Sequence, residues 1–215
     1  MSSRSRLTGR SRGKIVIISS PSGGGKTSIC RKLLSPARRR KGWRFSVSYT
    51  TRSPRPGERN GREYYFVDDS EFARMEKKNL FAESCRVHLY RYGTPCGPID
   101  KIRRSGGVMV FDVDVKGARK LREKYSDAIA IFVLPPSISA LKERLRIRGT
   151  ENAELRRIRL ENALREMKTF REYKFDYVVI NQYLDRAVRQ VLAIVEAHHC
   201  RIDRTDMEQI RRIVG

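Results

Sequence analysis

The sequence has few cysteines, no long apolar run and few acidic residues. Its four cysteines, Cys30, Cys85, Cys96 and Cys200, are scattered and form no C-x-x-C pair. This spacing favours reduced thiols over a disulfide framework. No apolar stretch approaches the roughly 20 residues that a membrane span requires, and no secretory signal is evident. We therefore expect a cytoplasmic protein with no membrane partner.

Acidic residues are outnumbered, with 24 Asp and Glu against 47 Lys and Arg, which gives a formal net charge of +23. Such an excess favours anionic partners, namely nucleotides, nucleic acid or an acidic surface. Charge alone does not choose among them. Because the sequence carries no RNA- or DNA-binding motif and no aromatic platform, we expect no specific nucleic-acid partner.

The chain is long enough for one sizeable α/β domain, or for a core with small inserted lobes, since 39% of its 215 residues are hydrophobic. The run His198-His199-Cys200 is not expected to bind a metal, because three consecutive residues on one helix point in different directions. The first residues are rich in Arg and Ser and contain no acid. We predict a disordered basic tail over 1–13 and a mobile tail over 201–215.

A glycine-rich loop lies between a buried strand and a helix. Ile15–Ile18 is apolar and β-branched, and a helical pattern begins at Lys26-Thr27. Glycines let backbone N–H groups turn toward an anion, the helix N-terminus favours negative charge, and a lysine adds a full positive charge. Except that Ser20 replaces the first glycine, the loop matches G-x-x-x-x-G-K-[ST]. It predicts an NTP-binding P-loop formed by Ser20, Pro21, Ser22, Gly23, Gly24, Gly25, Lys26 and Thr27, with the hydroxyl of Thr27 on Mg²⁺. The alternative is a glycine-rich turn with an incidental lysine.

A second apolar strand, Val108–Phe111, ends on Asp112. A carboxylate at the end of a buried strand beside a P-loop is typical of a magnesium-shell residue. The pattern is common on its own, so its value depends on the P-loop.

Strands and helices alternate along the chain, which predicts a three-layer α/β fold with a mostly parallel sheet. The predicted strands are Ile15–Ile18, Phe45–Ser48, Glu63–Val67, Leu80–Val87, Val108–Phe111, Ala128–Leu134 and Phe175–Ile180. The predicted helices begin near Thr27, Asp69, Pro98, Val115, Ser139, Glu154 and Leu184. Residues 38–42 are predicted to form an exposed connection, and Tyr92-Gly93-Thr94 a turn. The strand-rich segment 46–91 is the exception to the alternation and suggests an inserted lobe.

Two predicted helices carry clustered arginines. Arg144 and Arg148 stand four residues apart, and an arginine-rich helix that includes Arg159 follows. Like charges at this spacing cost a few tenths of a kcal/mol unless an anion lies between them.

Six motifs then occur in one order: SPSGGGKT, SYTTRSPRPGE, YGT, DVDVKGA, LPPS and RLRIRGT. Together they resemble guanylate kinases, from about Lys14 to Asp185. The resemblance implies a P-loop kinase core (14–45, 102–145 and 166–200) with an inserted NMP-binding lobe (46–101) and a small helical lid (146–165). It further implies Mg²⁺-dependent transfer of the ATP γ-phosphoryl group to GMP, giving ADP and GDP, in purine nucleotide metabolism.

The resemblance also assigns residues. The GMP-binding residues would be Ser48, Arg52, Arg55, Tyr64, Glu83, Tyr92, Thr94 and Asp114, with Glu83 and Thr94 reading the guanine. Asn181 would lie near the adenine of ATP. Thr27 and Asp112 would hold Mg²⁺. The catalytic residues would be Lys26, Arg52, Arg144, Arg148 and Arg159, the last three in the lid.

The sequence departs from the family pattern at Ser20, at 88–91 and at Gln182-Tyr183. One alternative is a guanylate-kinase-like module that binds phosphopeptides without catalysis, although Lys26, Thr27 and Asp112 argue for catalysis. Another is a P-loop kinase with a different phosphorylated acceptor, against which Glu83 and Thr94 argue. The sequence leaves open whether dGMP is accepted and whether the protein is a monomer or a homodimer.

Overall fold

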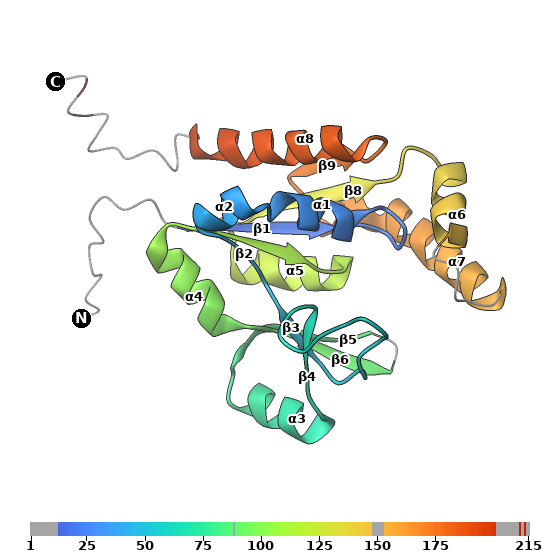
Figure 1. Ribbon diagram of the computed structural model, residues 1–215, viewed down its shortest axis with the longest axis horizontal. Helices are drawn as coiled ribbons and strands as arrows, with labels where there is room; N and C mark the ends of the chain where they lie inside the picture. The colour runs from blue at the N-terminus through green and yellow to red at the C-terminus, as the bar shows by residue number, and fades with distance from the viewer. Residues whose placement is uncertain (1–12, 88, 148–152, 201–210, 212, 214–215) are drawn as a thin grey trace.

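The computed structural model describes residues 13–87, 89–147, 153–200, 211 and 213. Their main sheet contains β1 (Lys14–Ser19), β2 (Trp43–Phe45), β7 (Val108–Asp112), β8 (Ile129–Leu134) and β9 (Tyr177–Ile180). Its strand order is β2-β7-β1-β8-β9, and every pair is parallel (Figure 1). The predicted parallel sheet is therefore confirmed.

Helices cover both faces of the main sheet. Val16 and Ile18 of β1 pack with α1 (Lys26–Leu33) and α8 (Leu184–Ala197). Ile15 and Ile17 pack with α4 (Cys96–Ser105) and α5 (Val115–Lys124) on the other face. Because side chains alternate along a strand, an all-apolar β1 can fill both cores at once. The result is the predicted three-layer arrangement.

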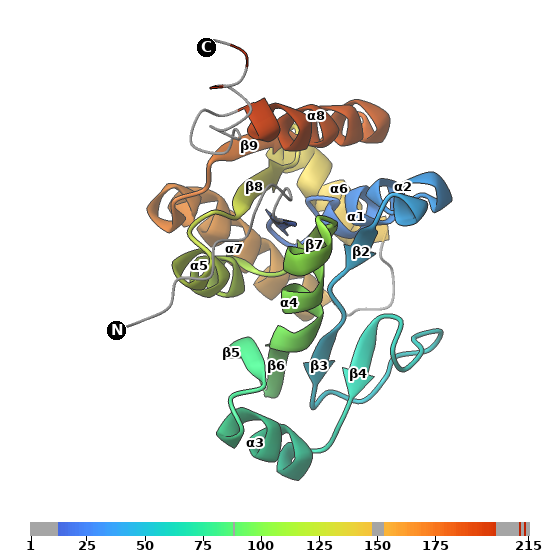
Figure 2. The same cartoon turned by 90° about the vertical axis from the view of Figure 1, so that its left-hand side faces the viewer.

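A second sheet forms from β3 (Ser48–Thr50), β4 (Tyr64–Phe66), β5 (Phe81–Val87) and β6 (Tyr90–Pro95), in the order β4-β3-β6-β5. Helix α3 (Asp69–Lys77) packs on it through Phe72, whose ring lies 4.7 Å from that of Phe81. Asp68 caps this helix by accepting the Glu71 N–H. In both views the second sheet lies at the opposite end of the molecule from α8 (Figures 1 and 2).

Two helices lie beyond the carboxyl ends of the central strands (Figure 1). They are α6 (Ile138–Ile147) and α7 (Ala153–Thr169), which pack on each other through Leu141, Leu145 and Ala163. Short 3₁₀ turns follow at η1 (Phe170–Tyr173) and η2 (His198–Cys200). Among the described residues, no helix is long and apolar enough to cross a membrane.

The prediction of an exposed connection at 38–42 was wrong over most of its length, because α2 (Pro36–Arg40) is a short helix. Proline is well suited to the first turn of a helix, where its missing N–H costs nothing. Arg38 and Arg39 donate to the carbonyls of Lys32 and Leu34, each at 2.9 Å, and so join the helix to the end of α1.

Two further predictions fail in the second sheet. The predicted strand Phe45–Ser48 is divided between β2 and β3, which belong to different sheets. The predicted turn at Tyr92-Gly93-Thr94 lies inside strand β6. Gly93 is needed there for close packing, since a Cβ atom on it would lie 2.9 Å from the ring of Phe81.

The predicted tails lie almost entirely outside the described residues. Gly13, the last residue of the predicted N-terminal tail, is buried and donates its N–H to the Arg103 carbonyl at 3.2 Å. That residue therefore belongs to the fold.

Candidate active site

The P-loop leaves the carboxyl end of β1 and enters α1. Gly23 and Gly25 have φ values of 85° and 93°, a conformation that glycine adopts without strain. Gly25 is the N-cap of α1 and has no side chain to bond the first helical N–H groups. These groups and the helix dipole therefore face outward as an anion-binding site. No glycine is needed at position 20, because Ser20 is not among the described residues with positive φ. Its hydroxyl donates to the Pro21 carbonyl at 3.0 Å.

Lys26 is the cation of this loop. Its ammonium group forms an ion pair with Asp112 and donates to the Val113 carbonyl at 3.0 Å. Burial alone would lower the pKa of Lys26, but the charge and hydrogen bond of Asp112 outweigh it and raise the pKa. The group is therefore charged at neutral pH.

Thr27 and Asp112 lie side by side, as a shared magnesium site requires. The Thr27 hydroxyl donates to Asp112 Oδ2 at 3.1 Å, and Asp112 Oδ1 faces Lys26. Parallel pairing of β1 with β7 sets Ile18 beside Asp112, which brings the two sequence motifs together. Mg²⁺ in nucleotide sites uses one or two protein oxygens, with phosphate and water as its other ligands. This hydroxyl and carboxylate pair fits that need.

Asn181 and Arg144 contact the back of the P-loop. Asn181 is 5% exposed, and its side-chain amide donates to the Gly24 carbonyl at 3.0 Å. Arg144 donates through Nη2 to the Asn181 carbonyl at 2.7 Å. Two residues predicted to bind ATP are thus joined to the loop and to each other.

Glu166 of α7 also lies beside the P-loop, and the sequence analysis missed it. Burial and the Asp114 charge raise the pKa of Glu166 to about 7, against the opposing effects of the Lys26 charge and the Ser22 backbone N–H. A weak signal existed, because Glu166 stands seven residues after Arg159 and hence on the same side of the helix.

Arg159 is half-buried on α7, and Arg148 lies outside the described residues. Of the three predicted lid arginines, the structure therefore places Arg144, just before the lid segment 146–165, against the P-loop, and the roles of all three stay predictions.

A second group of predicted site residues begins with Arg52, which is 8% exposed. Its guanidinium group donates to both oxygens of Glu58, at 3.0 and 2.9 Å. Burial lowers the pKa of Arg52, but hydrogen bonds with Glu58 and Tyr92 raise it above its ordinary value. Glu58 thus holds the arginine in place, and its part in the site was not predicted.

Arg55 differs from Arg52, because its side chain is exposed while its N–H donates to Glu58 at 2.8 Å. The same glutamate therefore organises the backbone of the loop that carries both arginines.

Glu83, Thr94 and Ser48 form a polar cluster. Thr94 is fully buried and donates to Glu83 Oε1 at 2.6 Å, and the hydroxyls of Thr94 and Ser48 lie 3.3 Å apart. Glu83 is 8% exposed, and its other oxygen, Oε2, is buried and has no hydrogen-bond partner in the part of the chain that the structure describes. Burial raises the pKa of Glu83 to about 7 although the hydrogen bond from Thr94 opposes this. Ser48 therefore lies with the predicted base-reading pair.

The two groups of residues meet at Tyr64 of β4. The guanidinium carbon of Arg52 lies 5.6 Å from the centroid of the Tyr64 ring, and the centroid of the Tyr92 ring lies 5.8 Å from it. Burial and the charge of Asp112 raise the pKa of Tyr64. Asp114 caps α5 by accepting the Gly117 N–H at 2.8 Å, and its charge acts on both Glu83 and Glu166. The predicted nucleotide residues from distant parts of the sequence therefore converge on one region.

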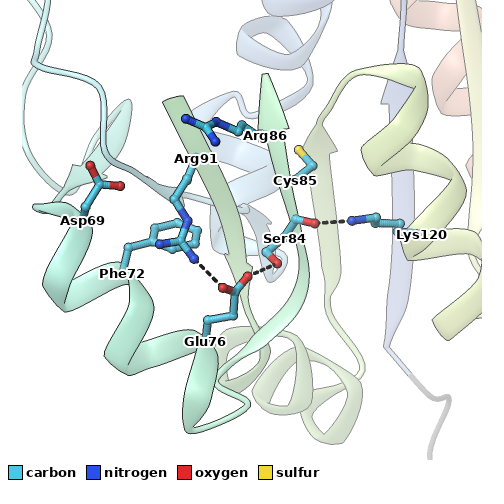
Figure 3. Close-up of a pocket in the computed structure, with 8 residues that line it drawn as sticks. All are labelled: Asp69, Phe72, Glu76, Ser84, Cys85, Arg86, Arg91 and Lys120. Atoms are coloured by element: carbon cyan, nitrogen blue, oxygen red, sulfur yellow. Dashed lines mark hydrogen bonds and ion pairs between the residues drawn. The ribbon is translucent and has the colours of Figure 1, made fainter. Parts of the chain in front are cut away.

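A separate hollow of about 680 Å³ lies between α3, β5 and α5 (Figure 3). Glu76 accepts hydrogen bonds from Arg91 and Ser84 there, and Lys120 of α5 donates to the Ser84 carbonyl. Arg91 is one of the residues that depart from the family pattern, and its guanidinium carbon lies 4.5 Å from the centroid of the Phe72 ring. Glu76 and Phe72 therefore hold the Arg91 side chain apart from Glu83 and Thr94.

A parallel-sheet core with a P-loop, and a second sheet followed by a loop that carries the buried Arg52, define the class. This is a P-loop kinase, an enzyme that moves a phosphoryl group between bound nucleotides or similar small molecules. The sequence model of the family described as guanylate kinase matches residues 12–198. The chain belongs to the guanylate kinase family.

Individual relatives agree with this assignment. The chain is 40% identical over 195 residues to a guanylate kinase of Caldanaerobacter subterraneus subsp. tengcongensis. The aligned residues cover 91% of this chain and 92% of the relative. It is 43% identical over 194 residues to one from Paramagnetospirillum magneticum, covering 90% and 88%. The crystal structure of guanylate kinase from Anaplasma phagocytophilum matches with a TM-score of 0.73 and 31% identity, covering 91% of this chain and 90% of that one.

Proposed function

We propose that this protein catalyses transfer of the γ-phosphoryl group from ATP to GMP, giving ADP and GDP, with Mg²⁺ as cofactor. A phosphate oxygen of GMP attacks the γ-phosphorus, and the bond to the ADP oxygen breaks. The family assignment supports this reaction, and the arrangement of the two pockets supports its two substrates. We further propose that it acts in purine nucleotide metabolism in the cytoplasm, as a monomer or homodimer and without a membrane or specific nucleic-acid partner.

The observation that carries the choice of GMP is the buried Glu83. Its Oε1 accepts a hydrogen bond from Thr94, whereas no described residue bonds its Oε2. An unpaired buried acceptor costs about 1–3 kcal/mol, which a ligand with matching donors recovers. Guanine offers N1–H and N2–H donors in the right pattern, and adenine does not.

The reaction asks for positioning and charge neutralisation more than for covalent help. In this proposal Lys26 and the N–H groups of α1 hold the ATP phosphates, and Arg52 holds the GMP phosphate with Arg55 and Tyr64. Thr27 and Asp112 would hold Mg²⁺, which supplies positive charge to the phosphate oxygens. Arg144, Arg148 and Arg159 would neutralise the group in transit and exclude water.

The family assignment suggests a division of the chain into three parts. We propose that 14–45, 102–145 and 166–200 form the core, that 46–101 form the GMP-binding lobe and that 146–165 form the lid. The second sheet with α3 supports the division of the lobe from the core.

The test mixes the protein with ATP, Mg²⁺ and either GMP, dGMP or AMP, and follows ADP. We expect turnover with GMP and none above background with AMP. The dGMP arm decides whether the deoxyribose is accepted. Turnover with AMP equal to that with GMP would contradict the proposal, and no turnover with any acceptor would favour a phosphopeptide-binding module.

Glu83→Gln sharpens this test, with Glu123→Gln, an exposed carboxylate on α5, as its control. Glutamine cannot accept both guanine donors with one neutral oxygen as well as a carboxylate does, so KM for GMP should rise at least about tenfold. The KM for ATP should stay unchanged, and the control should behave as wild type.

A further inference from the structure

We infer that Asn181 is a positioning residue of the phosphate loop, which sets the orientation of the Gly24–Gly25 peptide group for the triphosphate rather than reading the adenine. The inference rests on the proposed function in one respect, that a nucleoside triphosphate is the donor.

The first step of the argument is the hydrogen bond itself. The Asn181 amide donates to the Gly24 carbonyl at 3.0 Å, and a Cβ atom on Gly25 would lie 2.1 Å from the amide nitrogen. The side chain is therefore packed against the loop backbone and occupied by it. At least one of the two amide N–H donors is therefore used by the loop backbone.

The second step is the geometry of the peptide. Because a trans peptide is planar, its C=O and N–H point in opposite directions. Fixing the Gly24 carbonyl toward Asn181 therefore directs the Gly25 N–H to the other side of the loop. With glycine on both sides of the bond, this peptide group would otherwise have wide conformational freedom. Holding it before the ligand arrives removes that ordering cost from binding.

The third step is the rigidity of Asn181. Its own N–H donates to the Leu134 carbonyl at 2.8 Å, which continues the pairing of β8 with β9. Strand β8 pairs in turn with β1, from which the P-loop begins. Asn181 is therefore attached to the same sheet as the P-loop that it holds in position.

The same residue also fixes Arg144. Arg144 donates through Nη2 to the Asn181 carbonyl at 2.7 Å, and its buried Nη1 has no hydrogen-bond partner among the described residues. That nitrogen lies 3.8 Å from the position of a Cβ atom on Gly25. Asn181 therefore holds the loop by its side chain and an arginine beside the loop by its main chain.

The test separates a phosphate-loop brace from an adenine reader. Binding of ATP and of inorganic tripolyphosphate, each with Mg²⁺, is measured by calorimetry for wild type, Asn181→Ala and the near-isosteric Asn181→Asp. Loss of one hydrogen bond predicts a rise in Kd of about 3- to 10-fold, equal within twofold for both ligands, with GMP affinity unchanged. Gln182→Ala, at the exposed next residue, serves as the matched control and should bind as wild type.

The outcomes that overturn the inference are specific. Weaker binding of ATP with unchanged binding of tripolyphosphate would make Asn181 an adenine reader. Unchanged binding of both, or a wild-type protein that binds ATP but not tripolyphosphate, would also reject it. Thermal unfolding of each variant identifies a loss that comes from global instability, in which case GMP binding falls as well and the inference fails. Phosphorylation of GMP by wild type is scored separately, so failure of the proposed reaction leaves the binding result intact.

Discussion

Burial of Glu83 disfavours its charged form in the folded protein, whereas the proposed recognition of guanine uses its carboxylate as an acceptor. Its carboxylate is buried, and burial raises its pKa from 4.5 to about 7. The folded state therefore binds a proton more tightly than the unfolded chain, so this group's contribution to stability is fully present below about pH 4.5 and is lost as pH rises toward about 7. Guanine donors would recover that loss in the complex.

The first prediction follows for the ligand-free protein. Glu83→Gln removes the ionisable group, so its unfolding free energy should exceed that of wild type at pH 8 by about 2 kcal/mol, with a smaller gap at pH 5. Urea unfolding at both pH values measures the gap. An equal gap at the two pH values would show that Glu83 is charged in the empty pocket.

Glu166 gives a second prediction at the residue scale. Its carboxylate lies by the Ser22 N–H with a pKa near 7, where the ATP phosphates would add negative charge. Binding of ATP should raise this pKa further and so take up a proton at pH 7.5. In Glu166→Gln the uptake should fall, and ATP should bind about two- to fivefold more tightly.

Calorimetry in two buffers with different ionisation enthalpies measures that proton uptake. Glu143→Gln, an exposed carboxylate on α6 paired with Arg146, is the control and should keep the wild-type value. Equal uptake in the wild type and Glu166→Gln would exclude Glu166 as its source.

At the scale of elements, glycines at helix starts have unlike roles. Gly25 precedes α1 with φ of 93° and has the Asn181 amide against it, whereas Gly97 in the first turn of α4 has nothing within 4 Å of a Cβ atom. The positive φ and the Asn181 amide both exclude a side chain at position 25, whereas neither reason applies at position 97.

Gly25→Ala should therefore lower kcat/KM at least about a hundredfold, because it strains the backbone and displaces the brace. Gly97→Ala should leave activity unchanged and raise the unfolding free energy by about 0.5–1 kcal/mol, since alanine is the better helix former. Steady-state kinetics and urea unfolding of the pair measure both effects. Equal activity in the two variants would contradict this assignment.

The elements also show where local sequence patterns mislead. Ser46 continues the pairing of β2, since its N–H donates to the Val110 carbonyl at 2.9 Å, and the chain then leaves for β3. Gly93 has the composition of a turn but lies in a strand beneath two aromatic rings. In both cases a neighbour distant in sequence decides the outcome.

At the scale of the whole molecule, the two groups of predicted nucleotide-binding residues are attached to different sheets. Asp112 ends β7 of the main sheet and Lys26 begins α1 beside it, whereas Glu83 lies in β5 of the second sheet and Arg52 follows β3. Cationic groups from both sides would have to surround one phosphoryl group, which draws the two parts together when both ligands are present.

We predict that the radius of gyration falls when GMP and a non-hydrolysable ATP analogue are added together, and less with either alone. Small-angle X-ray scattering measures this change. Arg52→Ala, which loses the predicted phosphate contact, should stay near the ligand-free value at the same concentrations. No change with both ligands in wild type would contradict closure.

The sequence by itself determined those features that short runs of contiguous residues form. The P-loop, the strand ending on Asp112 and the alternation of strands and helices are local patterns, and the fold confirms them as structural elements. The remaining site residues were implied by the resemblance of the motifs to guanylate kinases, and of these the structure brings Ser48, Glu83 and Thr94 together.

Only the tertiary structure decided how distant residues meet. Glu58 fixing Arg52, Glu166 reaching Ser22 and Asn181 holding Gly24 all depend on which elements pack together. A glutamate or an asparagine carries no local sign of its partner, because burial and hydrogen bonding are properties of the folded surroundings. For that reason the charge state of Glu83 and the brace behind the phosphate loop became visible only in the fold.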